Sequence, residues 1–236
     1  MRLDTVFLLP GLDGTGKLFA GFTAVLPPTL RVVIAQYPTD HFLTYSDLVT
    51  LVSQMLPTSG SVVLIAESFS TPLAAKLVAN QSDQIAGLVM CAGFVTSPLR
   101  GSTALIRALV GPWLFRHLPP SSVLKYFLLG SDAPAPLEEA VEQTLRLVSP
   151  QVLSERVRAV LDCDARKDLA RVRVPMMYIR AERDRLVRGQ CFREIRDLRP
   201  DASFVSVRAP HLVLQKEPQR SAELIMRFIH QISRSS

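Results

Sequence analysis

Cysteine is scarce in this chain of 236 residues, and no long apolar run occurs in it. The three cysteines, Cys91, Cys163 and Cys191, have neither CxxC spacing nor an even count, which predicts reduced thiols rather than a disulfide framework. No stretch approaches the roughly 20 apolar residues that a membrane-spanning helix needs. Residues 1–4 lead into an expected strand without the apolar segment of a signal peptide. We therefore expect a cytoplasmic protein without a membrane span.

Nucleic-acid-binding and phosphate-binding motifs are also missing. The net charge is +6, and residues 166–236 carry 16 basic and 8 acidic side chains, but no basic run is interleaved with aromatic residues. We therefore expect no DNA or RNA partner. The glycine-rich segment 11–16 lacks the lysine and the Ser/Thr of a phosphate-binding loop. The basic excess has two explanations that stay open, an arginine-rich composition or an acidic partner.

Short apolar segments alternate with segments of helical spacing over much of the chain. Hydrophobic residues make up 48% of the sequence, which supplies the material for a large core. We expect strands near residues 5–9, 31–36, 62–65, 85–92, 172–180 and 203–207, separated by helices in most cases. This alternation predicts an α/β fold with a mostly parallel sheet of about six strands and helices on both faces. The length favours a single domain with an insertion.

The alternation stops between residues 97 and 165, where no convincing strand is found. The segment consists of helical pieces broken by prolines, and we interpret it as a helical cap inserted into a core formed by residues 1–96 and 166–236. Its first half is strongly apolar, with Trp113 and Phe127 as the predicted walls of a substrate pocket. A membrane-surface helix is the alternative, but the dense Lys/Arg face of such a helix is missing.

The segment 62–79 combines a buried strand, a tight turn with a central serine and a helix. A nucleophile elbow has this order and is usually written G-x-S-x-G. Here Ala66 and Ser70 replace the two glycines, and both are small enough for the close approach of strand and helix. Ser68 would then lie at a helix N-terminus, which favours a developing negative charge. The alternative is a serine that simply begins a core helix.

A serine nucleophile needs a histidine base, and active residues in open α/β sheets follow the carboxyl ends of strands. This rule distinguishes among the four histidines. His41 follows the second expected strand, His117 lies in the cap, and His230 lies near the end of the last helix. Only His211 follows the last expected strand. It is therefore the predicted base.

The carboxylate that would orient this base is expected one strand earlier. Asp184 lies in the loop after residues 172–180, and Glu182, two residues away, is the alternative acid. The resulting order Ser68, Asp184, His211 is the order expected for an α/β-hydrolase. Asp13 is interpreted as a turn residue, and neither Glu67 nor Cys91 is assigned any chemistry.

With these motifs the chain resembles the α/β-hydrolase superfamily over essentially its full length. The elbow matches residues 66–70, the acid loop matches residues 181–184, and the final histidine matches His211. Residues 10–12 match the family's oxyanion loop, so the resemblance implies that the backbone N–H groups of Leu12 and Phe69 form the oxyanion hole. Three departures are the missing elbow glycines, the missing histidine of the first loop and the absence of the family's N-terminal hairpin.

The resemblance implies a serine hydrolase, without metal or cofactor, that cleaves carboxylic esters of small to medium acyl chains through an acyl-enzyme. The sequences of segments 10–16 and 66–70 look especially similar to those of small bacterial hydrolases and of the hydrolase-like half of plant ester synthases. Two alternatives remain: an acyltransferase or thioesterase acting on carrier-bound acyl groups, and a non-catalytic ligand receptor on the same fold.

A positive rim around the pocket mouth is a further hypothesis about partners. Basic residues gather in the first half of the cap and beside Asp184, and they would attract an anionic ester or an acidic acyl carrier protein. The residues are Arg100, Arg107, Arg116, Lys125, Arg180, Arg183, Arg185 and Arg188.

Overall fold

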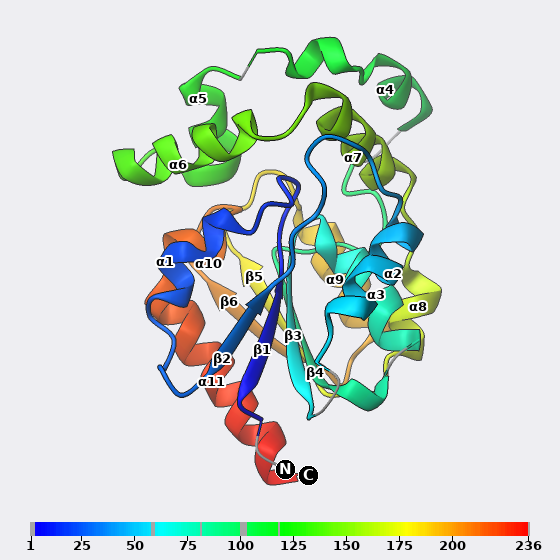
Figure 1. The fold of residues 1–236 in the computed structure, drawn as a ribbon, viewed down its shortest axis with the longest axis vertical. Coiled ribbons are helices and arrows are strands. Elements are labelled where there is room, and N and C mark those ends of the chain that lie inside the picture. Colours follow the sequence, from blue (N-terminus) through cyan, green and yellow to red (C-terminus); the bar gives the residue numbers. More distant parts are fainter. Residues whose placement is uncertain (1–2, 58–59, 81, 100–102, 118, 236) are drawn as a thin grey trace.

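Six parallel strands form one sheet in the order β2-β1-β3-β4-β5-β6 (Figure 1). The structure is a computed structural model that describes residues 3–57, 60–80, 82–99, 103–117 and 119–235. The strands are β1 (Thr5–Leu9), β2 (Arg31–Ile34), β3 (Val62–Glu67), β4 (Ile85–Cys91), β5 (Met176–Ala181) and β6 (Ser203–Val207). The predicted α/β fold with about six mostly parallel strands is confirmed.

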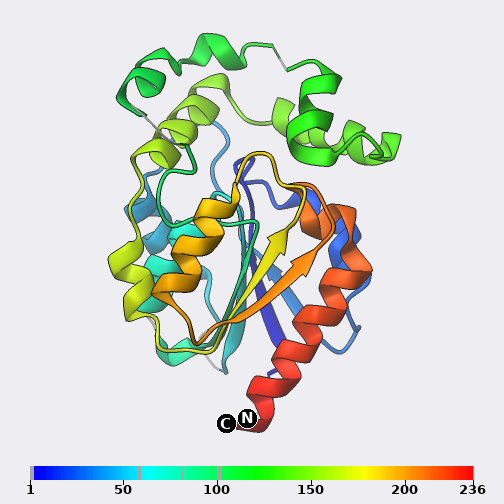
Figure 2. The ribbon, with the colours of Figure 1, turned by 180° about the vertical axis from the view of Figure 1, so that it is seen from behind.

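Helices cover both faces of the sheet (Figures 1 and 2). One face carries α2 (Tyr45–Met55), α3 (Ser70–Asn80), α8 (Arg166–Arg171) and α9 (Gly189–Leu198). The other carries α1 (Ala20–Thr23), α10 (Val213–Lys216) and α11 (Pro218–Ser235). Two short 3-10 turns are η1 (Lys17–Phe19) and η2 (Ser82–Gln84).

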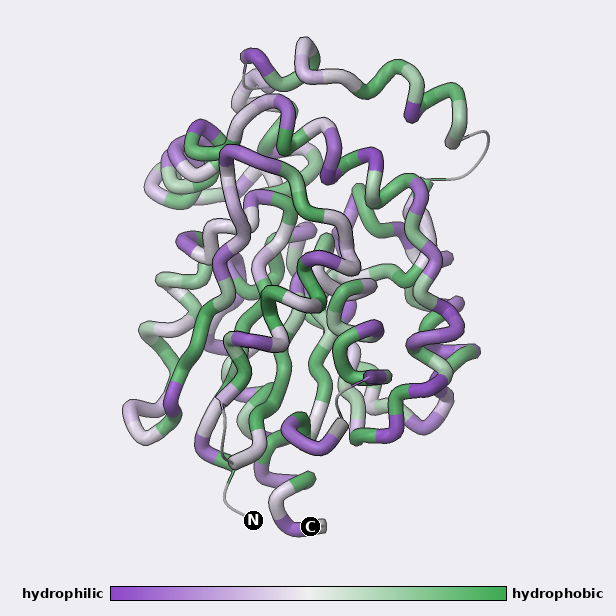
Figure 3. The backbone as a smooth tube through the Cα atoms, turned by 45° about the vertical axis from the view of Figure 1, so that its right-hand side comes forward, coloured by the Kyte–Doolittle hydropathy of each residue, from purple (hydrophilic) through white to green (hydrophobic). Residues whose placement is uncertain are grey.

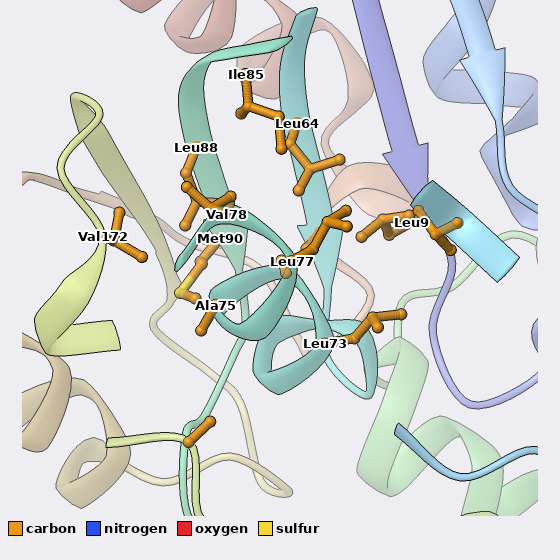
Figure 4. Close-up of a cluster of buried hydrophobic side chains, with 14 of the residues drawn as sticks. Leu9, Leu64, Leu73, Ala75, Leu77, Val78, Ile85, Leu88, Met90 and Val172 are labelled. Atoms are coloured by element: carbon orange, nitrogen blue, oxygen red, sulfur yellow. The ribbon is translucent and has the colours of Figure 1, made fainter. Parts of the chain in front are cut away.

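The two faces are filled by alternate residues of the same strands, as the two-residue period of a strand requires. In β3, Leu64 packs with the α2 and α3 side, whereas Val63 and Ile65 pack with the α1 and α11 side. Figure 4 shows Leu64 among the buried side chains around Leu73 and Leu77 of α3. All six residues of β3 are buried, so the strand that precedes Ser68 is held from both faces.

The insertion between β4 and α8 lies across the carboxyl ends of the strands as a separate layer (Figures 1 and 2). It contains α4 (Thr103–Leu109), η3 (Pro112–Phe115), α5 (Ser121–Leu124), a π-helical turn η4 (Lys125–Leu129), α6 (Ala135–Arg146) and α7 (Pro150–Asp162). An isolated antiparallel bridge between Thr96 and Asp164 joins its two ends. No strand occurs in the described part of 97–165, and we call this layer the cap.

Two of the largest differences from the expected boundaries occur at a proline. The strand expected at 172–180 begins only after Pro175, because proline lacks the N–H that an interior strand donates. The closing helix expected over 212–232 is two helices, and α11 starts at Pro218. Glu217, before this proline, leaves the helical region, as pre-proline residues tend to do.

Hydrophobic residues are concentrated along the strands, and the outer helices alternate between hydrophobic and hydrophilic residues (Figure 3). Within the described residues, no helix combines the length and apolar character needed to cross a membrane.

Candidate active site

Ser68 lies in the tight turn between β3 and α3. Its φ is +48°, in the left-handed region that non-glycine residues rarely adopt. Two backbone hydrogen bonds hold it there: Ser68 N–H donates to the Cys91 carbonyl at 3.0 Å, and Thr71 N–H donates to the Ser68 carbonyl at 2.9 Å. Strain of this kind persists when the surroundings determine the conformation, and it is concentrated at functional sites. The elbow predicted from the sequence is therefore present.

The residues that replace the elbow glycines are fully buried, and one of them adds a bond that glycine could not make. Ser70 Oγ donates to the carbonyl of Pro10 and accepts from the Tyr37 hydroxyl at 2.7 Å. Ala66 is 0% exposed and carries only a methyl group. The departure from glycine thus links the elbow to the loop that follows β1.

Ser68, His211 and Asp184 form one hydrogen-bonded chain. The Ser68 Oγ–His211 Nε2 distance is 2.8 Å, and the His211 Nδ1–Asp184 Oδ2 distance is 2.7 Å. The side chains of His211 and Asp184 are only 4% and 3% exposed. Asp184 Oδ1 accepts from the backbone N–H groups of Leu186 and Val187 at 2.8 and 2.9 Å, so both carboxylate oxygens are engaged.

The competing candidates lie elsewhere. Glu182 is exposed, and it is Asp184 that contacts the imidazole. His41 pairs with the neighbouring Asp40 on the surface, and His117 and His230 are exposed. In the part of the chain that the structure describes, no three His, Cys, Asp or Glu side chains are grouped as metal ligands.

Burial and charge act in opposite directions on His211. Burial lowers the pKa of the imidazole, but the charge of Asp184 and its hydrogen bond, with a smaller contribution from Glu67, raise the pKa above the usual 6.5. A histidine accepts a proton only when neutral. A reaction that uses His211 as its base should therefore gain rate as the pH rises through this raised pKa.

Glu67, the residue before Ser68, is a second buried carboxyl group beside the histidine. Burial raises its pKa to about 7, although the hydrogen bond from Gln215 Nε2 to Glu67 Oε2 (3.0 Å) opposes the rise. Glu67 Oε1 has no hydrogen-bond partner among the described residues. The sequence assigns no chemistry to Glu67, and the structure makes it a titrating group next to the hydrogen-bonded chain.

This buried carboxyl group predicts a pH-dependent change in stability. The folded-state pKa of about 7 exceeds the ordinary glutamate pKa of 4.5, so the folded state holds a proton that the unfolded state loses, and stability falls as the pH rises from 4.5 to 7. Glu67→Gln removes this loss and should raise the free energy of unfolding at pH 8 by up to about 3 kcal/mol, with little change at pH 4. Urea unfolding at both pH values measures it. An equal change in the free energy of unfolding at pH 4 and at pH 8 would contradict the raised pKa of Glu67.

The elbow and the loop after β1 each contain a backbone N–H group without an acceptor in the described residues. Neither Leu12 N–H nor Phe69 N–H donates to any group in the described residues. Leu12 lies in a turn closed by the hydrogen bond from Gly14 N–H to the Gly11 carbonyl at 3.1 Å. Phe69 is held by the Tyr45 hydroxyl, which donates to its carbonyl at 2.9 Å. These are the groups that the resemblance implies as oxyanion donors.

A cavity of about 280 Å³ opens on Ser68 and His211. Its wall is largely apolar, and its charged or titratable lining residues are Asp13, Glu67 and His211. The core contributes Leu12, Leu18, Phe69, Phe94, Val187 and Leu212, and the cap contributes Leu128, Val141, Leu145, Val157, Val160 and Leu161. The cavity therefore lies between the sheet's carboxyl edge and the cap.

Solved structures of other proteins share the fold of this chain. A hydrolase from Oleispira antarctica matches with a TM-score of 0.82 at 14% identity, covering 98% of this chain and 92% of that chain. A thermophilic esterase from Thermogutta terrifontis, solved with malate bound, matches with a TM-score of 0.81 at 18% identity, covering 98% and 91%. The chain has the α/β-hydrolase fold.

The same α/β-hydrolase fold is found in a bromoperoxidase from Bacillus anthracis, which matches with a TM-score of 0.82 at 15% identity, covering 97% of this chain and 92% of that chain. Neighbours with different activities therefore share the fold, and the fold alone does not assign a reaction. No protein-family model and no curated protein sequence matches the chain.

The pocket prediction for Trp113 and Phe127 is wrong. Trp113 is 61% exposed and Phe127 is 38% exposed, and neither lines the cavity. Both belong to a group of large apolar side chains on the outside of the cap, which also includes Leu105, Leu109, Leu114 and Tyr126. The apolar composition of the cap indicated a pocket wall, but its first half turns these side chains to solvent. Most of the cap's share of the wall comes from the later helices α6 and α7, with Pro98, Leu99 and Leu128 added from the first half.

Several basic side chains of the predicted positive rim are already engaged with other residues of the protein. Arg107 pairs with Asp162 at 2.6 Å, and Lys125 pairs with Glu138 at 2.9 Å. Arg185 lies over the Tyr126 ring at 3.9 Å from its centroid. Arg100 lies outside the described residues, and none of the remaining rim residues lines the cavity. An anionic substrate stays a prediction.

Arg156 is the residue near the site that the sequence analysis missed. It lies on α7 in the cap, is 2% exposed and donates to carbonyls of the loop after β1. No local motif distinguishes it from the other arginines of this arginine-rich chain, since its partners lie far away in the sequence.

Proposed function

We propose that this protein is a serine hydrolase that cleaves carboxylic esters. The observation that carries the proposal is the continuous hydrogen-bonded chain from Ser68 through His211 to Asp184, with Ser68 opening on an apolar cavity. A serine hydroxyl is a weak nucleophile until an adjacent base removes its proton, and this chain supplies the base and a carboxylate to orient it. Hydrolase and esterase neighbours of the same fold are consistent with the proposal.

In the acylation step, His211 Nε2 takes the Ser68 hydroxyl proton while Oγ attacks the ester carbonyl carbon. The carbonyl oxygen becomes an oxyanion, and the N–H groups of Leu12 and Phe69 donate to it. The imidazolium then gives its proton to the leaving alcohol as the C–O bond breaks, which leaves an acyl-enzyme on Ser68. Asp184 remains ionised and stabilises the imidazolium.

Water completes the cycle by the same route. His211 takes a proton from water, the resulting hydroxide attacks the acyl-enzyme carbonyl, and the second oxyanion uses the same two N–H donors. Collapse releases the carboxylic acid and returns the proton to Ser68. An acyltransferase would use an acceptor alcohol or thiol at this step in place of water.

The cavity supports an acyl group that is apolar and of small to medium size. Its volume of about 280 Å³ lies just below the usual range for ligand pockets, roughly 300–1,000 Å³. A long chain would have to extend out of it. An anionic ester or a carrier-borne acyl group remains a second proposal, which rests on the basic side chains around the cap rather than on the cavity wall.

The proposal is tested by labelling and turnover together. A fluorophosphonate probe should label Ser68, and p-nitrophenyl esters of rising acyl length should show a maximum of kcat/KM at short to medium chains. A purified, folded protein that takes up no probe and hydrolyses no ester would support the receptor alternative. Transfer of the acyl group to an added alcohol, in preference to water, would support the acyltransferase alternative.

A substitution in the cap wall should change the preferred acyl length. Val157→Phe adds bulk inside the cavity, so we expect kcat/KM for the longest accepted ester to fall by about 10- to 200-fold, the range for losing a close fit in an apolar pocket. The shortest ester should be affected much less. Trp113→Ala is the matched control, because Trp113 is exposed on the same cap and should leave the profile unchanged. A profile that shifts with Trp113→Ala but not with Val157→Phe would refute this placement of the wall.

A further inference from the structure

We propose that Arg156 of the cap is a positioning residue for the oxyanion hole, and that it sets the direction of the Leu12 N–H by holding the loop after β1. The inference rests on the proposed ester hydrolysis. It assigns a task to a cap residue that does not touch the reacting atoms. It also makes the cap a part of the catalytic arrangement rather than only a pocket wall.

Three hydrogen bonds of 2.8 Å fasten the Arg156 guanidinium. Nη1 donates to the carbonyls of Leu12 and Asp13, and Nη2 donates to the carbonyl of Pro38. The first two carbonyls belong to the loop after β1, and the third belongs to the segment after β2. A planar guanidinium with several fixed donors can hold such acceptors in one geometry, which a lysine ammonium cannot do equally well.

The direction of the Leu12 N–H follows from the turn that Arg156 holds. Leu12 and Asp13 are the two central residues of the turn that the Gly14–Gly11 hydrogen bond closes. In a planar trans peptide, the Gly11 carbonyl and the Leu12 N–H point in opposite directions. Because the carbonyl is bonded toward Gly14, the N–H points away from the interior of the turn. Fixing the carbonyls of both central residues therefore fixes the Leu12 donor.

Arg156 also contacts the residue that carries the second donor. Its guanidinium carbon lies 5.9 Å from the centroid of the Phe69 ring and 5.8 Å from that of the Tyr37 ring, within cation–π distance. The backbone N–H of Phe69 is the other group predicted to stabilise the oxyanion. One side chain thus reaches both residues of the oxyanion hole.

The Arg156 guanidinium is held by backbone carbonyls rather than by an ion pair, and the nearby charge of the buried Asp13 stabilises it. Within the described residues, no acidic side chain lies within ion-pair distance of Arg156, and its hydrogen bonds go to backbone carbonyls instead. Burial lowers the pKa of Arg156 and the charge of Asp13 opposes this, and an arginine remains charged in proteins. Burying a charge in this way is costly, so an apolar residue would serve better if filling space were the only task.

Gly14 supplies the room for this guanidinium. Its φ is +71°, and a Cβ built there would lie 2.6 Å from Arg156 Nη1 and 2.8 Å from Nη2. Any side chain at position 14 would therefore push the guanidinium out of its place, in addition to straining the backbone. The loop glycine and the cap arginine form a matched pair.

Arg158, two residues further along α7, provides a control. It too donates to a backbone carbonyl, that of Val110 at 2.9 Å, and it pairs with Glu155 at 2.8 Å. These partners all lie within the cap, so Arg158 contributes to the cap without contacting the oxyanion loop.

The test compares Arg156→Gln, Arg156→Lys and Arg158→Gln with the wild type, using a p-nitrophenyl ester and an alkyl boronic acid. A boronic acid bonded to Ser68 is tetrahedral and reports on the oxyanion hole, whereas KM reports mainly on the acyl pocket. Arg156→Gln should lower kcat by about 10²- to 10³-fold, the effect of losing one oxyanion donor. It should weaken boronic acid binding in parallel and change KM by less than about threefold. Arg156→Lys should recover part of both losses, and Arg158→Gln should stay within about twofold of the wild type.

Three results would overturn the inference: unchanged kcat in Arg156→Gln, a fall in kcat without weaker boronic acid binding, or an equal fall in Arg158→Gln. If Arg156→Gln does not fold, Arg156→Lys and Gly14→Ala carry the same comparison, and Gly14→Ala should reproduce the loss because it displaces the guanidinium. If the wild-type protein neither hydrolyses esters nor takes up a fluorophosphonate, the result contradicts both the proposed function and this inference. An active wild type with unaffected Arg156 variants ends the inference alone.

Discussion

Ser68→Ala should lower kcat for a p-nitrophenyl ester by about 10⁶-fold, the scale of removing a triad nucleophile. The substitution deletes one oxygen, and with it the atom that would carry the acyl group. Among the described residues, His211 is the only hydrogen-bond partner of the Ser68 hydroxyl, so the surrounding structure has little reason to change. The measurement is steady-state turnover together with fluorophosphonate labelling, which should disappear.

The matched control for this change is Ser70→Ala. Ser70 lies two residues away and its hydroxyl bonds to Pro10 and Tyr37, so its loss should loosen the link between elbow and loop without removing the nucleophile. Labelling should therefore persist in Ser70→Ala. Turnover close to the wild-type value in a correctly folded Ser68→Ala protein would eliminate the acyl-enzyme mechanism.

Asp184→Asn should lower kcat by about 10⁴-fold, by analogy with the same change in a serine-protease triad. Two effects combine. The amide can turn its NH₂ toward His211 Nδ1 and so favour the wrong tautomer, and the loss of the negative charge removes the main cause that raises the histidine pKa. The acidic limb of the residual kcat/KM profile should consequently move to lower pH, because a less basic imidazole is neutral at lower pH.

Glu182→Gln is the control for this prediction, since Glu182 is exposed in the same loop and makes no bond to His211. It should retain wild-type turnover. The reverse pattern, with activity lost in Glu182→Gln and kept in Asp184→Asn, would move the orienting acid to Glu182. A loss in Asp184→Asn without a shift of the pH profile would instead indicate damage to the loop that Asp184 holds through Leu186 and Val187.

The sheet and the hydrogen-bonded chain were predictable because their signals are local. Each buried strand is a short apolar run, and the positions of Ser68, Asp184 and His211 follow from the rule that active residues lie beyond the carboxyl ends of strands. The structure places these three side chains together as predicted, while their catalytic roles remain to be tested. The elbow was recognisable even without its glycines, since small residues suffice there.

The cap was less predictable, because the direction of a side chain depends on contacts between distant segments. The apolar residues of 105–127 indicated burial, yet Trp113 is exposed, whereas Val157 and Leu161 on a more polar helix form the wall. Arg156 illustrates the same limit. Its partners at positions 12, 13 and 38 are more than 100 residues away, and no pattern in the sequence joins them.

The bridge between Thr96 and Asp164 brings the two ends of the cap together on the core. An insertion whose ends meet can change in length or composition without disturbing the strands on either side, so this segment is a natural place for homologous proteins to diverge in substrate range. Arg156 limits that freedom. A transplanted cap would have to bring its own cation to the same three carbonyls, or the recipient loop would have to be exchanged with it. Cap and loop should therefore be inherited, and engineered, as one unit.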